Sequence, residues 1–493
     1  MKLSATRPGH ASTEEALEVS PAGRTRPHRR PRLRFLAVLV AATALVAAAC
    51  GGGDDSDSGD GSGDGGAADE GTPVSGGEIA YGLEAETSGG WCLPESQLAI
   101  SGIQVARTIY DTLTAPNADG EIVPFLAESV EPNDDYTEFT ITLREGVKFH
   151  DGSDLTAEVV KNNLDAYRGE YPARQPLLFR FVFEDVENVE VVDPLTVKVT
   201  TAMPWPSFPW ALYGTGRVGI VAQAQLDDPD TCDTKLIGTG PFKLIDWVQN
   251  DSLVAERNPD YWQTDSEGNQ LPYLDRITYR PIVDETARVN ALASGDIQAM
   301  MTNDGTAIEQ IKASADEGTL AAVQSDQLSE VSFVMFNTSK PPFDSQVARE
   351  AVARALDVQQ YIDIIGVGQF EAASGPFAKG VIGYLEDAGF PEFDQARAEE
   401  LAAQYEQESG QPLEFTLAGA NSDGTVRALS FIQDQMSQAG IETEIDPIEQ
   451  AALINTALGG DWQAMLFRNY PGGDPDTQYN WWYTGSPRPR PDR

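Results

Sequence analysis

The chain has 493 residues, which is long enough for two or three domains with substantial cores. Its 77 acidic residues outnumber its 34 basic residues, and the formal net charge is −43. A charge this negative disfavours contact with nucleic acid and with anionic lipid headgroups. We therefore expect no nucleic-acid partner.

The first 49 residues read as an export signal. Arginines between Arg24 and Arg34 precede an apolar run of 15 residues from Phe35 to Ala49, and Cys50 follows directly. This order is typical of a signal peptide, and the run is shorter than the about 20 residues of a membrane-spanning helix. The pattern resembles a bacterial lipobox, which implies cleavage before Cys50 and lipidation of its thiol. A transmembrane anchor with an incidental cysteine is the alternative.

Residues 50–77 are mostly Gly, Ser and Asp, which predicts a disordered tether. The two remaining cysteines are Cys92 and Cys232. In an exported chain a disulfide between them is favoured over a metal pair, because zinc would need further Cys or His ligands nearby. We expect no metal site and no cofactor.

Alternating and helical patterns follow one another along the rest of the chain. Residues 139–143 alternate as a half-buried strand does, and residues 190–199 predict two strands that turn at Asp193–Pro194. Residues 154–167 predict a helix with Thr156 as its N-cap. Further helices are expected at 347–356, after an Asp357 cap, at 396–405 and at 425–439. The sequence therefore predicts a mixed α/β fold without internal repeats.

Common enzyme signatures are missing from the sequence. It has no HExxH, GxSxG, Walker loop or CxxC, and His150 is the only histidine beyond residue 49. A single histidine cannot build a multi-histidine metal site and leaves one candidate for Ser-His catalysis. We predict that the chain is not an enzyme and that His150 makes local hydrogen bonds in a loop. An exported hydrolase is the alternative from a different class.

Several short blocks occur in a fixed order. They are Arg144–Gly152 (REGVKFHDG), Leu155–Val160, Gly238–Phe242 (GTGPF), Arg257–Trp262 (RNPDYW) with Leu271–Asp275, Gly295–Asp296, and Phe336–Phe343 with Arg349, Ala351 and Asp357. Together they resemble the bacterial extracellular solute-binding proteins of family 5, the peptide/nickel-type binding subunits of ABC importers. Because the blocks consist largely of turn formers and aromatic residues, we expect them to specify the fold and not the ligand.

The resemblance implies an α/β fold of the large peptide-binding type, with two lobes that close on a solute by hinge motion. We expect lobe I at residues 78–280 and lobe II at residues 281–484. Family members continue further, so residues 485–493 read as a disordered tail and the C-terminal return segment as truncated. The implied partners are permease subunits in the membrane, and the chain is expected to be an extracytoplasmic monomer tethered through Cys50.

In the family's peptide binders, an Asp that precedes an acidic-Pro pair by three residues holds the amino terminus of the peptide. The matching pair is Asp474–Pro475, and Pro471 occupies the anchor position; Asp474 or Asp476 could substitute for the missing anchor. Arg468 could hold a carboxylate or phosphate, or it could pair with one of the many acidic side chains. The predicted ligand-binding residues are Trp91, Arg468, Asn469, Tyr470, Asp474 and Trp481.

An oligopeptide is the expected solute, because the resemblance is to peptide-type binding proteins. The absent amine anchor leaves open another solute, such as a sugar, an opine-like acid or a metal chelate. The unusual C-terminus leaves open a truncated remnant that binds nothing.

Overall fold

A computed structural model of the chain describes residues 73–86, 90–96, 98–324, 330–470 and 472–478. All described residues belong to one compact unit, which begins at Gly71. The predictions for the signal peptide, Cys50, most of the tether, Trp481 and residues 485–493 therefore lie outside the described residues. No helix among the described residues is long and apolar enough to cross a membrane.

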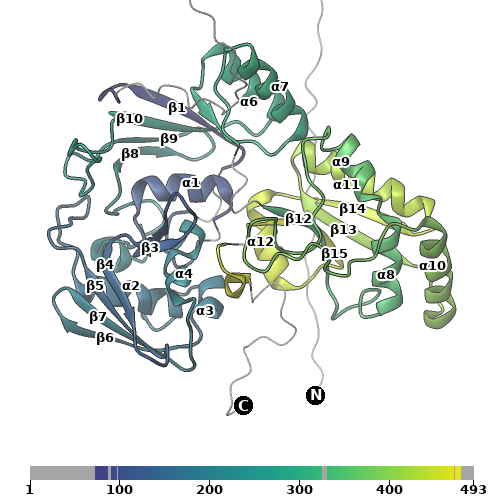
Figure 1. Ribbon diagram of the computed structural model, residues 1–493, viewed down its shortest axis with the longest axis horizontal. Helices are drawn as coiled ribbons and strands as arrows, with labels where there is room; N and C mark the ends of the chain where they lie inside the picture. The colour runs from purple at the N-terminus through teal and green to yellow at the C-terminus, as the bar shows by residue number, and fades with distance from the viewer. Residues whose placement is uncertain (1–72, 87–89, 97, 325–329, 471, 479–493) are drawn as a thin grey trace, which may run out of the picture. The chain divides into compact units, whose positions relative to one another are not determined.

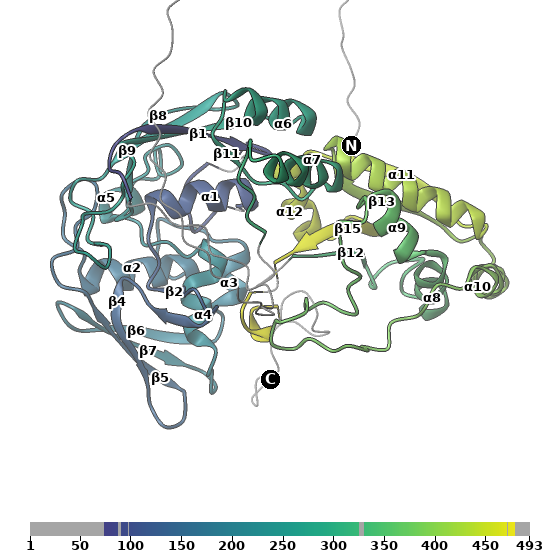
Figure 2. The ribbon, with the colours of Figure 1, turned by 45° about the horizontal axis from the view of Figure 1, so that its top comes forward.

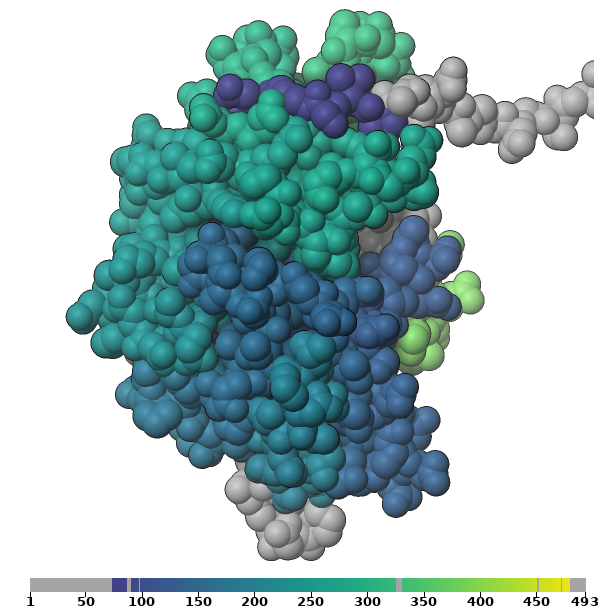
Figure 3. All heavy atoms as spheres, turned by 90° about the vertical axis from the view of Figure 1, so that its left-hand side faces the viewer, coloured from purple at the N-terminus to yellow at the C-terminus, as the bar shows by residue number. Residues whose placement is uncertain are grey.

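The first sheet of lobe I combines segments that are far apart in the sequence. Its strand β1 (Glu78–Leu83) lies between two parallel partners, β10 (Arg276–Pro281) and β11 (Ala299–Met300). Antiparallel β9 (Ser252–Arg257) and β8 (Phe242–Val248) complete the order β11-β1-β10-β9-β8. In the space-filling view, the purple residues of β1 lie directly against teal residues from much later in the chain (Figure 3).

This sheet includes residues that follow the expected end of lobe I at residue 280. Strand β11 pairs with β1, and the side chain of Ile297 just before it is only 1% exposed. Helix α6 (Glu285–Ser294) packs here too, because Arg288 lies against Gly82 of β1. The sheet of β1 thus reaches Met300, beyond the expected end of lobe I at residue 280.

A second sheet of lobe I is antiparallel throughout. Its order is β4 (Ala127–Pro132), β5 (Glu138–Leu143), β7 (Thr196–Thr201) and β6 (Val186–Asp193). The predicted strand at 139–143 and the predicted hairpin around Asp193 are therefore confirmed. A short hairpin of β2 (Thr114–Pro116) and β3 (Ile122–Pro124) lies apart from this sheet.

The helices of lobe I follow from local signals where those signals are strong. Helix α2 (Ala157–Arg168) begins where Thr156 accepts a hydrogen bond from the Val159 amide at 3.4 Å, and it ends at Gly169 in the left-handed region. The predicted helix and cap are confirmed. The other helices of the lobe are α1 (Ile100–Ile109), α3 (Leu178–Val182), α4 (Phe208–Tyr213), η1 (Gly214–Gly216) and α5 (Gln223–Leu226).

Lobe II contains one mixed sheet. Its order is β12 (Val331–Phe336), β15 (Ala464–Asn469), β13 (Glu414–Ala420) and β14 (Glu442–Ile448), with β12 antiparallel to β15 and the other pairs parallel. The buried residues of the two lobes form separate hydrophobic clusters. Lobe I holds mostly purple-to-teal elements and lobe II green-to-yellow elements (Figure 1).

The helices predicted in lobe II are all present, with boundaries shifted by a few residues. They are α8 (Gln346–Ala355), α9 (Val358–Ile364), α10 (Gln395–Ser409) and α11 (Asp423–Gln438). Asp357 caps α9 by accepting from the Gln360 amide at 3.0 Å. Helices α8 and α10 lie side by side in both ribbon views (Figures 1 and 2). The remaining helices are α7 (Gly305–Asp316), α12 (Gln450–Gly459) and η2 (Pro475–Gln478).

A disulfide joins Cys92 to Cys232, as the sequence led us to expect, with 4.9 Å between the Cα atoms. It fastens the segment before α1 to the loop before β8. The amide of Trp91 strengthens the same junction by donating to the Asp233 carbonyl oxygen at 3.0 Å.

Candidate functional site

Two of the sequence blocks that carry the family resemblance meet at one buried carboxylate, Asp111. Thr239 of the GTGPF block and Trp262 of the RNPDYW block each donate to Asp111 Oδ2 at 2.9 Å, and the Tyr261 hydroxyl donates to Oδ1 at 3.3 Å. Burial raises the pKa of Asp111 to about 6, although these hydrogen bonds oppose the shift. None of these four residues lines the large cleft described below.

His150 joins a second block to the same turn. Its Nδ1 accepts from the Gly238 amide at 3.3 Å, so Nε2 carries the proton and donates to the Gly240 carbonyl oxygen at 3.0 Å. Burial lowers the pKa of His150 to about 4, which keeps the ring neutral. His150 lies in a loop as predicted, but its ring bonds to a turn 88 to 90 residues away and not to local neighbours.

The glycines of this turn are required by close packing. A Cβ on Gly238 would overlap the Ile109 carbonyl oxygen, and one on Gly240 would lie 2.6 Å from the Ile109 carbonyl carbon. The turn therefore presses on the last residue of α1, a helix that lines the cleft with residues from Ile100 to Arg107. These three blocks of lobe I thus hold its scaffold together, and the candidate functional site lies elsewhere.

A large cleft runs between lobe I and lobe II. Its volume is about 3370 Å³, several times the roughly 300–1,000 Å³ of a typical small-molecule site. Lobe I contributes α1, α3 and β11, and lobe II contributes β12, β15 and the long loop between α9 and α10. Among the described residues that line it, nine are acidic and six are basic. The wall is therefore mixed in charge, in contrast to the strongly acidic chain as a whole.

Each lobe presents the edge of a sheet to this cleft. All six residues of β12 and both residues of β11 line it. Within the described part of the chain, β12 pairs with β15 alone and β11 pairs with β1 alone. One edge of each strand therefore carries unpaired backbone groups.

The register identifies which backbone groups of β12 are free. The Asn337 amide donates to the Gln463 carbonyl oxygen at 2.8 Å, immediately beyond the paired strands. Because hydrogen-bonded and non-hydrogen-bonded positions alternate in an antiparallel pair, Ser332, Val334 and Phe336 point their N–H and C=O groups away from β15. These groups lie at the edge that lines the cleft.

Arg468 of β15 connects the two lobes across the cleft. Its Nη2 donates to the carboxylate of Glu84, which directly follows β1, and its Nη1 lies 3.7 Å from the Glu330 carboxylate. Although burial favours the neutral form, the charges of Glu84 and Glu330 raise the pKa of Arg468. Of the two expectations for this residue, pairing with acidic side chains is the one observed.

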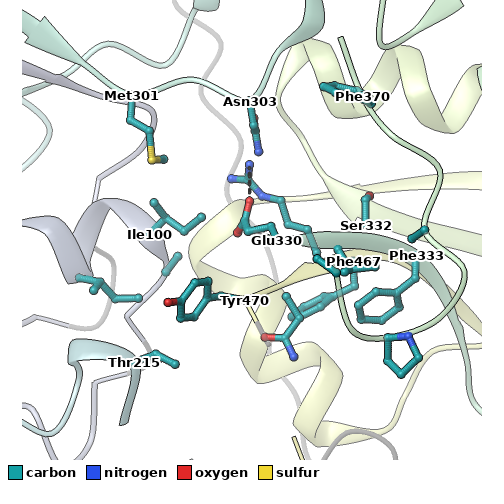
Figure 4. Close-up of a pocket in the computed structure, with 18 of the residues that line it drawn as sticks. Ile100, Thr215, Met301, Asn303, Glu330, Ser332, Phe333, Phe370, Phe467 and Tyr470 are labelled. Carbon is teal, nitrogen blue, oxygen red and sulfur yellow. Dashed lines mark ion pairs between the residues drawn. The ribbon is translucent and has the colours of Figure 1, made fainter. Parts of the chain in front are cut away.

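Glu330 lies in the cleft just before β12. The close-up shows it among Asn303, Tyr470 and Ser332, with a dashed line to its arginine partner (Figure 4). Burial raises the pKa of Glu330, while the charge of Arg468 lowers it and that of Glu84 raises it. Three groups from distant parts of the sequence thus form one ion-pair cluster, Glu84–Arg468–Glu330.

The predicted binding residues after Arg468 differ in whether they line the cleft. Tyr470 lines the cleft, and burial raises the pKa of its hydroxyl. Asn469 also lines the cleft but donates its amide to Gln478, which fixes η2. Asp474 does not line the cleft; its Oδ1 accepts from the Asp476 amide at 2.9 Å and caps η2.

Asp476 was considered as a substitute for the missing amine anchor. Its Oδ2 accepts from Trp205 Nε1 at 2.6 Å and from the Ser207 hydroxyl at 2.8 Å. Both donors belong to lobe I, so this carboxylate fastens the end of the described chain to that lobe. Asp476 therefore serves an internal contact.

Trp91 is placed outside the cleft. Its side chain is 1% exposed and packs edge-to-face against Trp247 with ring centroids 5.8 Å apart. The prediction rested on its neighbourhood in the sequence, but the disulfide beside it draws the indole into the core of lobe I. We remove Trp91 and Asp474 from the ligand-binding set; Trp481 lies outside the described residues.

Sequence reasoning missed Glu84, Glu330 and the edge of β12. The two glutamates carried no signal, because a chain with 77 acidic residues offers many partners for one arginine. The edge of β12 depends on which strands pair, and that is set by contacts over long sequence separations. No group of three or more potential metal ligands is present among the described residues.

Two lobes around a cleft lined by sheet edges define the architecture of a solute-binding protein. Residues 121–489 match the bacterial extracellular solute-binding proteins, family 5 (middle region). The chain belongs to this family of ABC-importer binding proteins, and its relatives are binding proteins and not enzymes.

One similar protein is the glutathione-binding protein GsiB of Salmonella paratyphi A. It is 31% identical over 348 residues, which cover 70% of this chain and 65% of that protein. The chain thus matches less than two thirds of the length of such relatives.

Two solved structures share the fold. DppA from Helicobacter pylori, in complex with the peptide STSA, has a TM-score of 0.73 and 24% identity, covering 83% of this chain and 81% of that one. AgaA from A. tumefaciens R10, in complex with agropinic acid, has a TM-score of 0.73 and 26% identity, covering 83% and 80%. The expected two-lobe fold of the large peptide-binding type is confirmed.

Proposed function

We propose that this chain captures short peptides outside the cytoplasmic membrane and delivers them to the permease of an ABC importer. One observation carries the proposal: two sheet edges with unpaired backbone groups, β11 of lobe I and β12 of lobe II, line the same cleft. An extended peptide can satisfy such an edge by adding a strand, since its own backbone offers the complementary donors and acceptors.

The backbone of Ser332, Val334 and Phe336 is the expected docking edge on lobe II. Recognition through main-chain hydrogen bonds is tolerant of side chains, and the volume of about 3370 Å³ leaves room for them. Closure of the lobes on the peptide would add the edge of β11 from the other side and exclude water from both sets of hydrogen bonds.

The export signal and Cys50 support the location. A diacyl group on Cys50 would supply two chains, which suffice for stable anchoring where one chain is marginal. The acidic body would be held off the membrane by the Gly/Ser/Asp tether, near the permease, and would act as a monomer.

The test is a binding screen on the purified exported chain by thermal shift and calorimetry. Trialanine and other unmodified tripeptides should raise the melting temperature, and the same tripeptides with N-methylated backbone amides should bind at least about tenfold more weakly, since each lost hydrogen bond costs about 1 kcal/mol or more. Sugars, agropinic acid and a nickel–histidine chelate complete the screen. A shift with sugars or chelate alone would overturn the peptide assignment.

A further inference from the structure

The cluster Glu84–Arg468–Glu330 is unequal in its two contacts. Arg468 donates a direct hydrogen bond to Glu84, whereas Glu330 stands 3.7 Å away, beyond hydrogen-bond length. A guanidinium has five N–H donors, and among the described residues the side chain of Arg468 donates a hydrogen bond only to Glu84. Arg468 thus retains donors in a wall that faces the cleft.

Glu330 is the weakly held member of the cluster. Its side chain is 25% exposed, and its only ion pair within the described residues is the long one to Arg468. Burial raises its pKa, so the environment disfavours its charged form. Moving this carboxylate outward would break one loose ion pair and relieve a desolvated charge.

The cluster lies at one end of the edge on which a peptide would dock. Arg468 is opposite Ser332 in the register of β15 and β12, and Glu330 immediately precedes β12. A strand added along Ser332, Val334 and Phe336 would therefore bring one of its ends beside Glu330, whose carboxylate lies 3.7 Å from Arg468 Nη1. With Pro471 at the amine-anchor position, a positive group is what the described wall offers to that end.

We propose that Arg468 binds the carboxylate of the solute and that Glu330 is the resident counter-ion that this carboxylate replaces. The inference rests on the proposed function and narrows it to solutes with a free carboxylate, such as peptides with an unblocked C-terminus. The exchange is electroneutral at the guanidinium, because one carboxylate leaves as another arrives. The arriving group gains the planar two-bond geometry that Glu330 lacks.

Glu84 has a separate part in this arrangement. It holds Arg468 from lobe I through a direct hydrogen bond, so the guanidinium is oriented before the solute arrives. Arg468 therefore needs little reordering when a carboxylate binds, which lowers the entropic cost of association.

The test compares trialanine with trialanine amide by calorimetry on the full exported chain. The wild type should bind the acid about tenfold more tightly than the amide, the size expected for a charged hydrogen-bonded pair. Arg468→Gln should reduce that ratio to near one. Glu330→Gln should tighten binding of the acid about threefold or more while leaving the amide unchanged, because it removes the competitor.

The matched control is Glu371→Gln. Glu371 also lines the cleft, and it forms no ion pair with any other described residue. The Glu371→Gln substitution removes one negative charge from the cleft, as Glu330→Gln does, without affecting the ion pair of Arg468. It should therefore leave the ratio of acid to amide affinities as in the wild type. Thermal melting checks that each variant is folded. If Arg468→Gln does not fold, the binding ratio of Glu330→Gln tests the carboxylate site instead.

Two failures are distinguishable. Equal binding of acid and amide by the wild type, or a Glu330→Gln result identical to that of Glu371→Gln, would overturn the carboxylate site and leave peptide binding intact. Binding of neither trialanine nor its amide, nor of any other peptide, would overturn the proposed function and this inference with it.

Discussion

Trp205 Nε1 donates a 2.6 Å hydrogen bond to the carboxylate of Asp476, a residue 271 positions later in the chain. The Ser207 hydroxyl donates to the same oxygen at 2.8 Å. Close by, Gly473 lies so near the Trp210 ring that a Cβ would overlap it. The chain after β15 is thus fastened to lobe I beside the cleft, by contacts that depend on one carboxylate and one missing side chain.

Replacing Asp476 by Ala should destabilise the protein. The two donors from lobe I would lose a charged acceptor, and such hydrogen bonds contribute about 1.5–3 kcal/mol. Urea unfolding should show this loss in the free energy of unfolding. Asp135→Ala is the control, because Asp135 is exposed in a loop of lobe I and should change the free energy by less than about 0.5 kcal/mol. Equal effects of the two substitutions would contradict the importance of the contact.

Replacing Gly473 by Ala should also destabilise the protein, by about 1–3 kcal/mol, since the added methyl group must displace the Trp210 ring or the backbone. Gly459→Ala is the matched control. Nothing lies within 4 Å of a Cβ at Gly459, which is the last residue of helix α12. There alanine should be neutral or stabilise by up to about 1 kcal/mol. Urea midpoints of both variants check the difference; a neutral Gly473→Ala would contradict the close packing.

His150 should make stability depend on pH. Its pKa is about 4 in the folded protein and near 6.5 when unfolded. Because the folded pKa is depressed, the unfolded state binds more protons between these values, and the stabilisation is fully present above pH 6.5 and lost as pH falls to about 4. His150→Asn should therefore unfold with a smaller loss of stability from pH 6.5 to pH 4 than the wild type.

Asp111 titrates in the same window with the opposite sign. Its pKa is raised to about 6, so its contribution favours the folded state at low pH and is lost as pH rises through 6. Comparing His150→Asn with the wild type at each pH cancels this contribution. Identical pH profiles for the two proteins would contradict a neutral, buried His150.

Removing the disulfide should lower the free energy of unfolding by about 2–5 kcal/mol, which is the range for native disulfides. The upper value is the one expected from chain entropy for a long loop. Cys92 and Cys232 are 140 residues apart in sequence. Urea unfolding with and without reductant measures the loss, with Cys92→Ser/Cys232→Ser as the variant that reductant should not affect. Thiol titration of Cys50→Ser should find no free thiol before reduction; two would contradict the bridge.

Local features of the fold could be predicted from the sequence. The Thr156 and Asp357 caps, the strand at 139–143 and the hairpin at Asp193 depend on neighbours within a few residues, and each is observed. The resemblance in the sequence blocks supplied the two-lobe architecture, which no local signal contains.

Pairings over long sequence separations could not be predicted. Strand β1 pairs with β10 and β11, which follow it by about two hundred residues. The partners of Arg468 and the burial of Trp91 are of the same kind. The environment of each residue depends on which distant segment packs against it. The sequence contains many acidic residues and several tryptophans, so it does not say which of them will be paired or buried.

The hydrogen bonds among Asp111, His150 and the GTGPF turn have a consequence for how such proteins diversify. Asp111, His150 and the residues of the GTGPF turn bond to one another, and none of them lines the cleft. Substitutions on the walls that meet the solute can therefore accumulate without disturbing them. Two chains with the same blocks need not bind the same compound, and a change of solute requires no change in the fold.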